Sequence, residues 1–175
     1  MAIPARQLSR ELRTASTPDL RRRRWIFGLS LIGTLAAQIV GLFQMGLLRR
    51  LPDPPVGPFD SSRVDASDYG HSRLQMPDAG LMLLTYGVTA ALAMAGAADR
   101  ARRNPALPLA LAAKTAYDSA TCLKLAQEEW AENRAFCAYC QAATLVSLAS
   151  FALSLPEAGR ALGSLTGRRA ARARR

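Results

Sequence analysis

The stretch WIFGLSLIGTLAAQIVGLFQMGLL, residues 25–48, has no ionisable side chain. A transmembrane helix needs about 20 such residues to cross a hydrocarbon core about 30 Å thick. The stretch is too long for a signal peptide and ends in Arg49-Arg50 without a small-residue cleavage site. It therefore predicts a membrane-spanning helix and an all-α integral membrane protein.

Three later stretches are also long and rich in apolar residues. Residues 76–97 carry only Asp78, and residues 135–155 carry no charge. Residues 105–127 are interrupted by Lys114, Asp118 and Lys124, but their alanine and leucine content suits a helix buried among others. We predict a four-helix transmembrane bundle over residues 21–156, with spans 25–48, 76–97, 105–127 and 135–155, an N-terminal tail 1–20 and a basic tail 157–175.

The charges are unevenly placed. Lys and Arg number 23 against 13 Asp and Glu, a formal net charge of +10. Arginines gather at residues 21–24, 100–103 and 168–175. Positive residues stay on the cytoplasmic side, so both tails are predicted to be cytoplasmic, and loops 49–75 and 128–134 to face outward. This describes a multi-pass protein of the bacterial cytoplasmic (inner) membrane.

The basic tails have a simple explanation in topology and in attraction to anionic membrane lipid. They lack interleaved aromatic residues or a binding fold, so nucleic acid is not an expected partner.

Cys137-Ala138-Tyr139-Cys140 begins the last predicted span at its outer end. Two thiols three residues apart share one face of a helix, and the free N–H groups of a helix N-terminus favour thiolate. We predict a redox pair, with Asn133 as a helix cap. Alternatively the two cysteines simply fill space in a bundle. No metal site is predicted, because structural zinc needs four ligands and only Cys122 and His71 remain.

The first outward loop has two parts. Residues 51–58 contain four prolines, which cannot form a helix. Residues 59–74 mix Phe59, Val64, Tyr69 and Leu74 with Asp and Ser, a pattern typical of a short interfacial helix or lid.

These residues resemble the vitamin K epoxide reductase family, four-helix membrane oxidoreductases that couple disulfide formation to quinone reduction. The Cys-x-x-Cys pair and the topology carry the resemblance, together with Ser61-Ser62-Arg63-Val64, which is similar to the family's Cys-Ser-Arg-Val. The resemblance implies a quinone cofactor, menaquinone or ubiquinone. It also implies quinone contacts at Asp78 and Tyr86, which fall like the family's Asn and Tyr, and at Thr144.

One departure from the family affects the electron route. The family usually has two loop cysteines that pass electrons to the Cys-x-x-Cys pair, but Ser61 stands at the second position and Asp53 near the first. A hydroxyl cannot exchange with a disulfide. A thioredoxin-like protein or small thiol outside the cytoplasm would therefore attack Cys137 directly, and Cys140, about 4.5 Å deeper, would face the quinone. The alternative is a non-catalytic membrane scaffold or binding relative of the family.

The third predicted span has a polar stripe of Lys114, Tyr117, Asp118, Thr121 and Cys122. Such residues are expected to face the bundle interior. Lys114 and Asp118 either neutralise each other or help to protonate quinone, and Cys122 has either a redox role or a packing role.

Overall fold

The computed structural model of the chain describes residues 4–67 and 76–173, with side chains up to residue 167. Tyr69, Gly70, His71 and Leu74 lie outside the described residues. The named elements are all α-helices: α1 (Ala5–Thr14), α2 (Pro18–Gln44), α3 (Ser61–Ala66), α4 (Asp78–Met94), α5 (Arg100–Arg103), α6 (Ala106–Asn133) and α7 (Ala138–Ala173).

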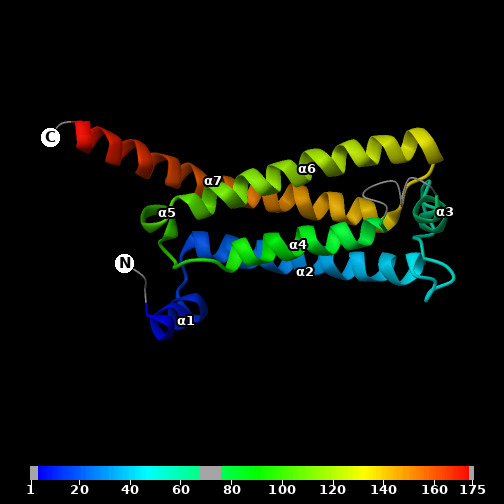
Figure 1. Cartoon of the computed structure of the whole chain (residues 1–175), viewed down its shortest axis with the longest axis horizontal. Coiled ribbons are helices and arrows are strands. Elements are labelled where there is room, and N and C mark those ends of the chain that lie inside the picture. The colour runs from blue at the N-terminus through cyan, green and yellow to red at the C-terminus, as the bar shows by residue number, and fades with distance from the viewer. Residues whose placement is uncertain (1–3, 68–75, 174–175) are drawn as a thin grey trace.

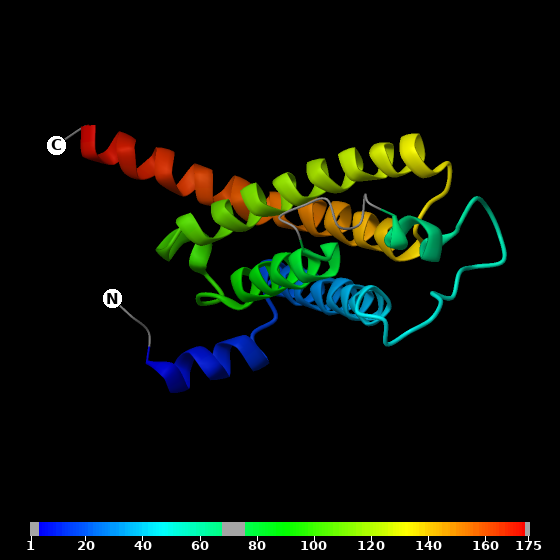
Figure 2. The ribbon, with the colours of Figure 1, turned by 45° about the vertical axis from the view of Figure 1, so that its right-hand side comes forward.

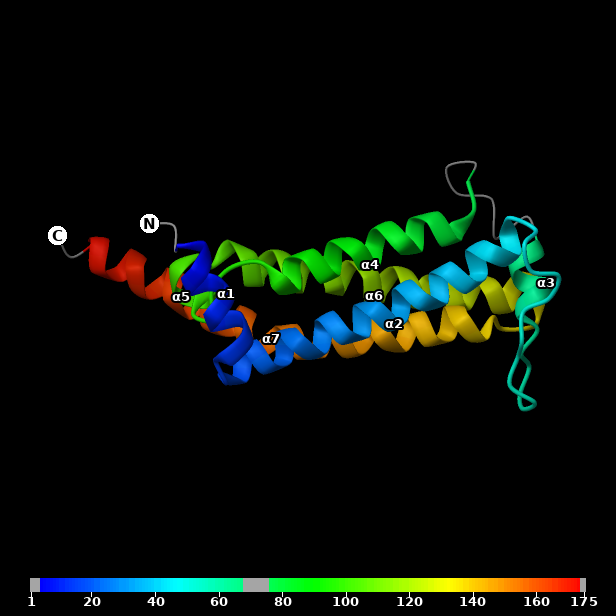
Figure 3. The ribbon, with the colours of Figure 1, turned by 90° about the horizontal axis from the view of Figure 1, so that it is seen from below.

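The four long helices α2, α4, α6 and α7 run alongside one another (Figure 1). Helix α3 lies at one end of them, which we call the loop end. Both chain termini, α1 and α5 lie at the other, which we call the terminal end. Figures 2 and 3 show the same arrangement from two further directions. Helix α2 packs against α4 and α7, and α6 packs against α7.

Two helices are long and apolar enough to cross a membrane, namely α2 and residues Ala138–Gly167 of α7. Helix α4 is apolar but shorter, at 17 residues. Large side chains on α2 point away from the other helices, because Leu31, Ile32 and Leu35 are each more than half exposed. Apolar side chains on the outside suit contact with lipid rather than water.

The long helices begin and end at recognisable residues. Thr17 caps α2 by accepting a hydrogen bond from the Leu20 N–H at 3.2 Å, and Pro18 occupies its first turn. Gly96 follows α4 with φ of 80°, a conformation that favours glycine. Arg134 ends α6 in the left-handed region, with φ of 52°.

Two helices are longer than their predicted spans. Helix α6 continues to Asn133, so most of the stretch that the sequence predicts as a loop at residues 128–134 is helical. Lys124 and Glu128 pair across one turn of this extension at 3.4 Å. Helix α7 begins after Cys137 and runs through the predicted basic tail to residue 173, so that its C-terminal part projects beyond the bundle (Figure 1).

The bundle interior contains two clusters of buried side chains below the loop end. Ile26, Ala93 and Leu111 join α2, α4 and α6. Tyr86 of α4 packs against Ala143 and Val146 of α7. A Cβ atom at Gly33 would lie 2.6 Å from the Tyr86 ring, so α2 can approach α4 this closely only with glycine there.

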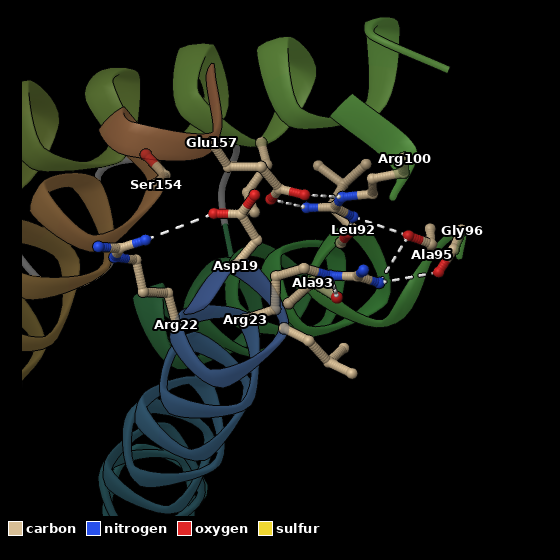
Figure 4. Close-up of polar contacts among 12 residues, drawn as sticks. Asp19, Arg22, Arg23, Leu92, Ala93, Ala95, Gly96, Arg100, Ser154 and Glu157 are labelled. Carbon is tan, nitrogen blue, oxygen red and sulfur yellow. Dashed lines mark hydrogen bonds and ion pairs between the residues drawn. The ribbon is translucent and has the colours of Figure 1, made fainter. Parts of the chain in front are cut away.

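The terminal end holds a buried polar cluster (Figure 4). Arg100 donates to both carboxylate oxygens of Glu157, at 2.9 and 2.8 Å, and to the carbonyls of Leu92 and Ala95. Arg23 donates to the carbonyls of residues 93, 95, 96 and 97. These carbonyls lie at the C-terminus of α4, where a helix lacks internal partners and attracts cations. The cluster therefore ties the end of α4 to α2, α5 and α7.

Candidate redox site

The segment before α3 is attached to the segment before α7. The Phe136 N–H donates to the Pro58 carbonyl at 2.8 Å, and the Asp60 N–H donates to the Phe136 carbonyl at 3.0 Å. Phe59 and Phe136 form an isolated parallel bridge. These bonds hold α3 over the start of α7, and we call residues 58–66 the lid.

Ser61 fastens the lid to α7. Its side chain is fully buried, and its hydroxyl donates to the Asp53 carboxylate and accepts a hydrogen bond from the Ala138 N–H at 2.8 Å. The Ser61 N–H also donates to Asp53 Oδ2 at 3.0 Å. Asp53 and Ser61, which stand where the resemblance places loop cysteines, are thus in contact. They form a hydrogen-bonded latch that has no redox chemistry of its own.

Cys137 lies directly beneath the lid. Its thiol donates to Asp65 Oδ2 at 3.0 Å, and its sulfur accepts the Cys140 N–H at 3.3 Å. This second contact is an N-cap interaction, so Cys137 itself caps α7. Both cysteines are free thiols.

The solvent exposure of Cys137 and Cys140 is the reverse of what the sequence predicts. The sequence places Cys137 nearer the aqueous edge, but its side chain is 0 % exposed, packed with Val64 and Ala135, whereas Cys140 is only partly buried. The physical reason is the lid, which covers the end of α7.

Glu129 supports the same turn from α6. Its Oε1 accepts the Cys137 N–H at 2.6 Å, and its Oε2 accepts a hydrogen bond from Gln141 Nε2 at 2.7 Å. Burial raises the pKa of Glu129 to about 7. The predicted cap, Asn133, is instead the last residue of α6, and among the described residues its buried Nδ2 has no hydrogen-bond partner.

Of the predicted quinone contacts, Tyr86 and Thr144 lie close to Cys140. The Tyr86 hydroxyl donates to the carbonyl of Ala143 at 2.9 Å and lies 3.3 Å from the Ser147 hydroxyl. The Thr144 hydroxyl donates to the Cys140 carbonyl at 2.9 Å. Asp78 is eight residues before Tyr86 on α4, about 12 Å away along the helix axis. Thr144 thus contacts the backbone of Cys140, and Tyr86 contacts α7 one to two turns further along the helix.

These residues fit a quinone in part. The hydroxyls of Thr144 and Tyr86 lie one to two turns further along α7 than Cys140, where a quinone carbonyl oxygen would need hydrogen-bond donors. The Tyr86 hydroxyl would, however, have to leave the Ala143 carbonyl before it could donate to a ligand.

The polar stripe of the third span is partly interior. Lys114 Nζ pairs with Asp118 and donates at 2.7 Å to the Thr85 carbonyl and to the Thr89 hydroxyl of α4. The Cys122 thiol lies 3.6 Å from the Ser147 hydroxyl. Tyr117 is 72 % exposed, so its predicted interior position was wrong. The stripe therefore links α6 to α4 and α7.

The sequence model of the vitamin K epoxide reductase family matches residues 24–155. The chain belongs to the vitamin K epoxide reductase family. Its members are membrane thiol–disulfide oxidoreductases that use quinone-type cofactors, and the matched residues include the lid and the Cys-x-x-Cys pair. Comparison with curated proteins and with solved structures gives no match.

Asp65 and Glu129 are the two site residues of this family member that the sequence analysis missed. Asp65 is about one helical turn after Ser61, and Glu129 is about one turn before the end of α6. The sequence does show a carboxylate in the predicted lid and another near the end of a helix. It does not show that Asp65 contacts the Cys137 thiol, because the two residues are 72 positions apart.

Proposed function

We propose that this family member passes electrons from thiols outside the cytoplasm through Cys137 and Cys140 to a membrane quinone, menaquinone or ubiquinone. The observation that carries the proposal is the Cys137 sulfur, held between Asp65 Oδ2 at 3.0 Å and the Cys140 N–H at 3.3 Å at the first turn of α7.

Two thiols of the donor reduce the Cys137–Cys140 disulfide. The first forms a mixed disulfide with Cys137 and releases Cys140, and the second displaces Cys137 and closes the donor disulfide. Two electrons and two protons thereby reach the pair. The donor is a thioredoxin-like protein or a small thiol.

The quinone, when bound, supplies an acceptor for two electrons and two protons. Cys140 is the less buried of the two residues and would face it, with Tyr86 and Thr144 nearby and Asp78 as a further predicted contact. To restore the disulfide, both thiols must lose their protons, and the pair must give up two electrons, which the quinone would take up together with two protons to become the quinol. Asp65 is placed to accept the Cys137 proton, because it already accepts the thiol hydrogen bond.

Since Cys137 is covered, the lid must move before a donor reaches it. We propose that all four long helices span the bacterial inner membrane, with the lid outside and both termini in the cytoplasm. Arg21–24, Arg100, Arg102 and Arg103 lie with both termini at one end of the bundle, which supports this orientation.

The test is anaerobic quinone reduction by the purified protein with a small dithiol. We expect turnover in the wild type and in Cys122→Ser, and none in Cys137→Ser or Cys140→Ser. Turnover that survives loss of both Cys137 and Cys140 would refute the proposal.

The second candidate is a non-catalytic scaffold. The full burial of Cys137 and the redox-inert Asp53–Ser61 latch favour it. Absence of quinone reduction with every thiol tested, in a protein that remains folded, would support the scaffold.

A further inference from the structure

Three potential metal ligands meet beneath the lid. One carboxylate oxygen of Asp65 and the sulfur atoms of Cys137 and Cys140 all lie within 4.8 Å of one another. Cys137 and Asp65 are buried and Cys140 is partly buried. Cysteine and histidine alone supply too few ligands for a metal, whereas the fold adds a carboxylate from α3.

We infer that the reduced Cys137–Cys140 pair and Asp65 form a reversible binding site for a thiophilic divalent cation such as Zn²⁺ or Cd²⁺. Thiolate sulfur selects such cations, and three protein ligands leave a fourth tetrahedral position for water or an external thiolate. The inference does not rest on the proposed quinone chemistry.

The distances suit the cation. A Zn–S bond of about 2.3 Å and a Zn–O bond of about 2.1 Å require sulfur atoms about 3.8 Å apart and sulfur–oxygen distances of about 3.6 Å in a tetrahedron. The observed limit of 4.8 Å and the Cys137–Asp65 distance of 3.0 Å bracket these values. The three ligand atoms therefore already lie near the separations that a tetrahedral site requires.

The neighbouring residues hold the ligands in place. Glu129 binds the backbone N–H of Cys137, and the Ser61 latch fixes the helix that carries Asp65. Two thiolates and one carboxylate around a divalent cation leave one net negative charge. The N-terminus of α7 lies beside this charge and favours it.

Binding depends on the redox state of the pair. Two thiol protons leave when both sulfurs bind the cation, and no electron is transferred. In the disulfide the sulfurs are bonded to each other and neither is a thiolate ligand. The site therefore exists only in the reduced protein, where the bound cation would block disulfide formation.

The experiment is a titration of the full-length, reduced protein in detergent with Cd²⁺ under anaerobic conditions. Binding is followed by the ultraviolet charge-transfer absorption of cadmium–thiolate bonds, and proton release by an indicator dye. We expect one Cd²⁺ and two protons per reduced chain, and no charge-transfer band in the oxidised protein.

Variants assign the ligands. Cys137→Ser and Cys140→Ser should abolish the one-to-one complex, and Cys122→Ser should keep it. Asp65→Asn should weaken binding at least about tenfold, since even changes beyond the ligands cost about 10–100-fold. Asp65→Glu should restore much of the affinity, which separates ligation from misfolding, and the exposed carboxylate variant Glu132→Gln should bind like the wild type.

Three results would overturn the inference. They are equal affinity in Asp65→Asn and the wild type, loss of binding in Cys122→Ser, and binding of Cd²⁺ by the oxidised protein with the same absorption.

Discussion

At the scale of single residues, Glu129 is the side chain that joins α6 to the redox turn. It is 1 % exposed, and each of its carboxylate oxygens accepts one hydrogen bond, from the Cys137 N–H and from Gln141 Nε2. Burial favours the neutral acid, and the two hydrogen bonds favour the carboxylate. Burial is the larger effect, so the pKa of Glu129 rises from 4.5 to about 7.

This shift predicts a pH-dependent stability. The folded-state pKa of about 7 exceeds the ordinary 4.5, so the contribution of Glu129 to stability is complete below pH 4.5 and is lost as the pH rises through 7. Its size is on the order of 3 kcal/mol. We expect the apparent melting temperature of the wild type to fall between pH 5 and 8 relative to that of Glu129→Gln.

The matched control is the exposed carboxylate variant Glu132→Gln, which should follow the wild type. If the melting temperatures of the wild type and Glu129→Gln change equally with pH over this range, Glu129 is not the source of the pH dependence.

At the scale of elements, the lid controls access to Cys137. Ser61→Ala removes the hydroxyl that bonds both Asp53 and the Ala138 N–H, and it leaves a buried donor without its partner. An unsatisfied buried donor costs about 1–3 kcal/mol. We expect the lid to open more often, and Cys137 to react with a small alkylating reagent about 5- to 150-fold faster.

Ser62→Ala is the matched control, because the Ser62 hydroxyl accepts a hydrogen bond from the Leu51 N–H within the loop and, among the described residues, makes no hydrogen bond to α7. Alkylation rates should be followed in the Cys122→Ser background. If Ser61→Ala and Ser62→Ala accelerate alkylation equally, the latch to α7 is not what closes the lid.

The second element-scale prediction concerns the Arg100–Glu157 ion pair between α5 and α7. Both side chains are about 97 % or more buried, so Arg100→Met would leave an unpaired carboxylate inside the protein. Removing one partner of such a pair costs about 3–5 kcal/mol. We expect the free energy of unfolding, measured with denaturant in mixed micelles, to fall by this amount in Arg100→Met. The double variant Arg100→Met/Glu157→Leu should recover part of the loss.

Arg103→Met removes the exposed pair between Arg103 of the same helix and its N-cap residue Asp99, and it should cost far less than Arg100→Met, because water already solvates both charges. Equal losses in Arg100→Met and Arg103→Met would show that burial does not set the value of the pair.

The sequence predicts elements better than contacts between them. Charge-free stretches such as residues 25–48 identify α2 and α7, because length and composition are local properties. The lid contacts join residues that are far apart, such as Cys137 and Asp65, and no periodicity records them. For the same reason the covering of Cys137 and the position of Glu129 could not be predicted, while the family's Cys-x-x-Cys pair could.

At the scale of the whole molecule, the chain combines a bundle of long helices with a loop that has Asp53 and Ser61 where the family usually has cysteines. Both termini and the arginine-rich segments of residues 21–24 and 100–103 lie at one end, and α3 and the start of α7 lie at the other (Figure 1). Cys137 and Cys140 belong to that start of α7. The loop positions expected to relay electrons now form a hydrogen-bonded closure. Under the proposed function, a donor would act at the loop end on Cys137 itself, and that function therefore depends on the orientation of the bundle.

The last prediction tests that orientation with two introduced cysteines. In a Cys122→Ser/Cys137→Ser/Cys140→Ser background, Val56→Cys places a thiol at the loop end, where Val56 is 67 % exposed, and Ser16→Cys places one on the exposed segment before α2. Basic segments resist translocation, so the terminal end should be cytoplasmic. A membrane-impermeant maleimide applied to cells with an accessible outer face of the inner membrane should label Val56→Cys at once. It should label Ser16→Cys only after the membrane is permeabilised. The reverse pattern would place the site cysteines in the cytoplasm, where reducing conditions oppose disulfide formation, and equal labelling of both variants in intact cells would rule out a single orientation.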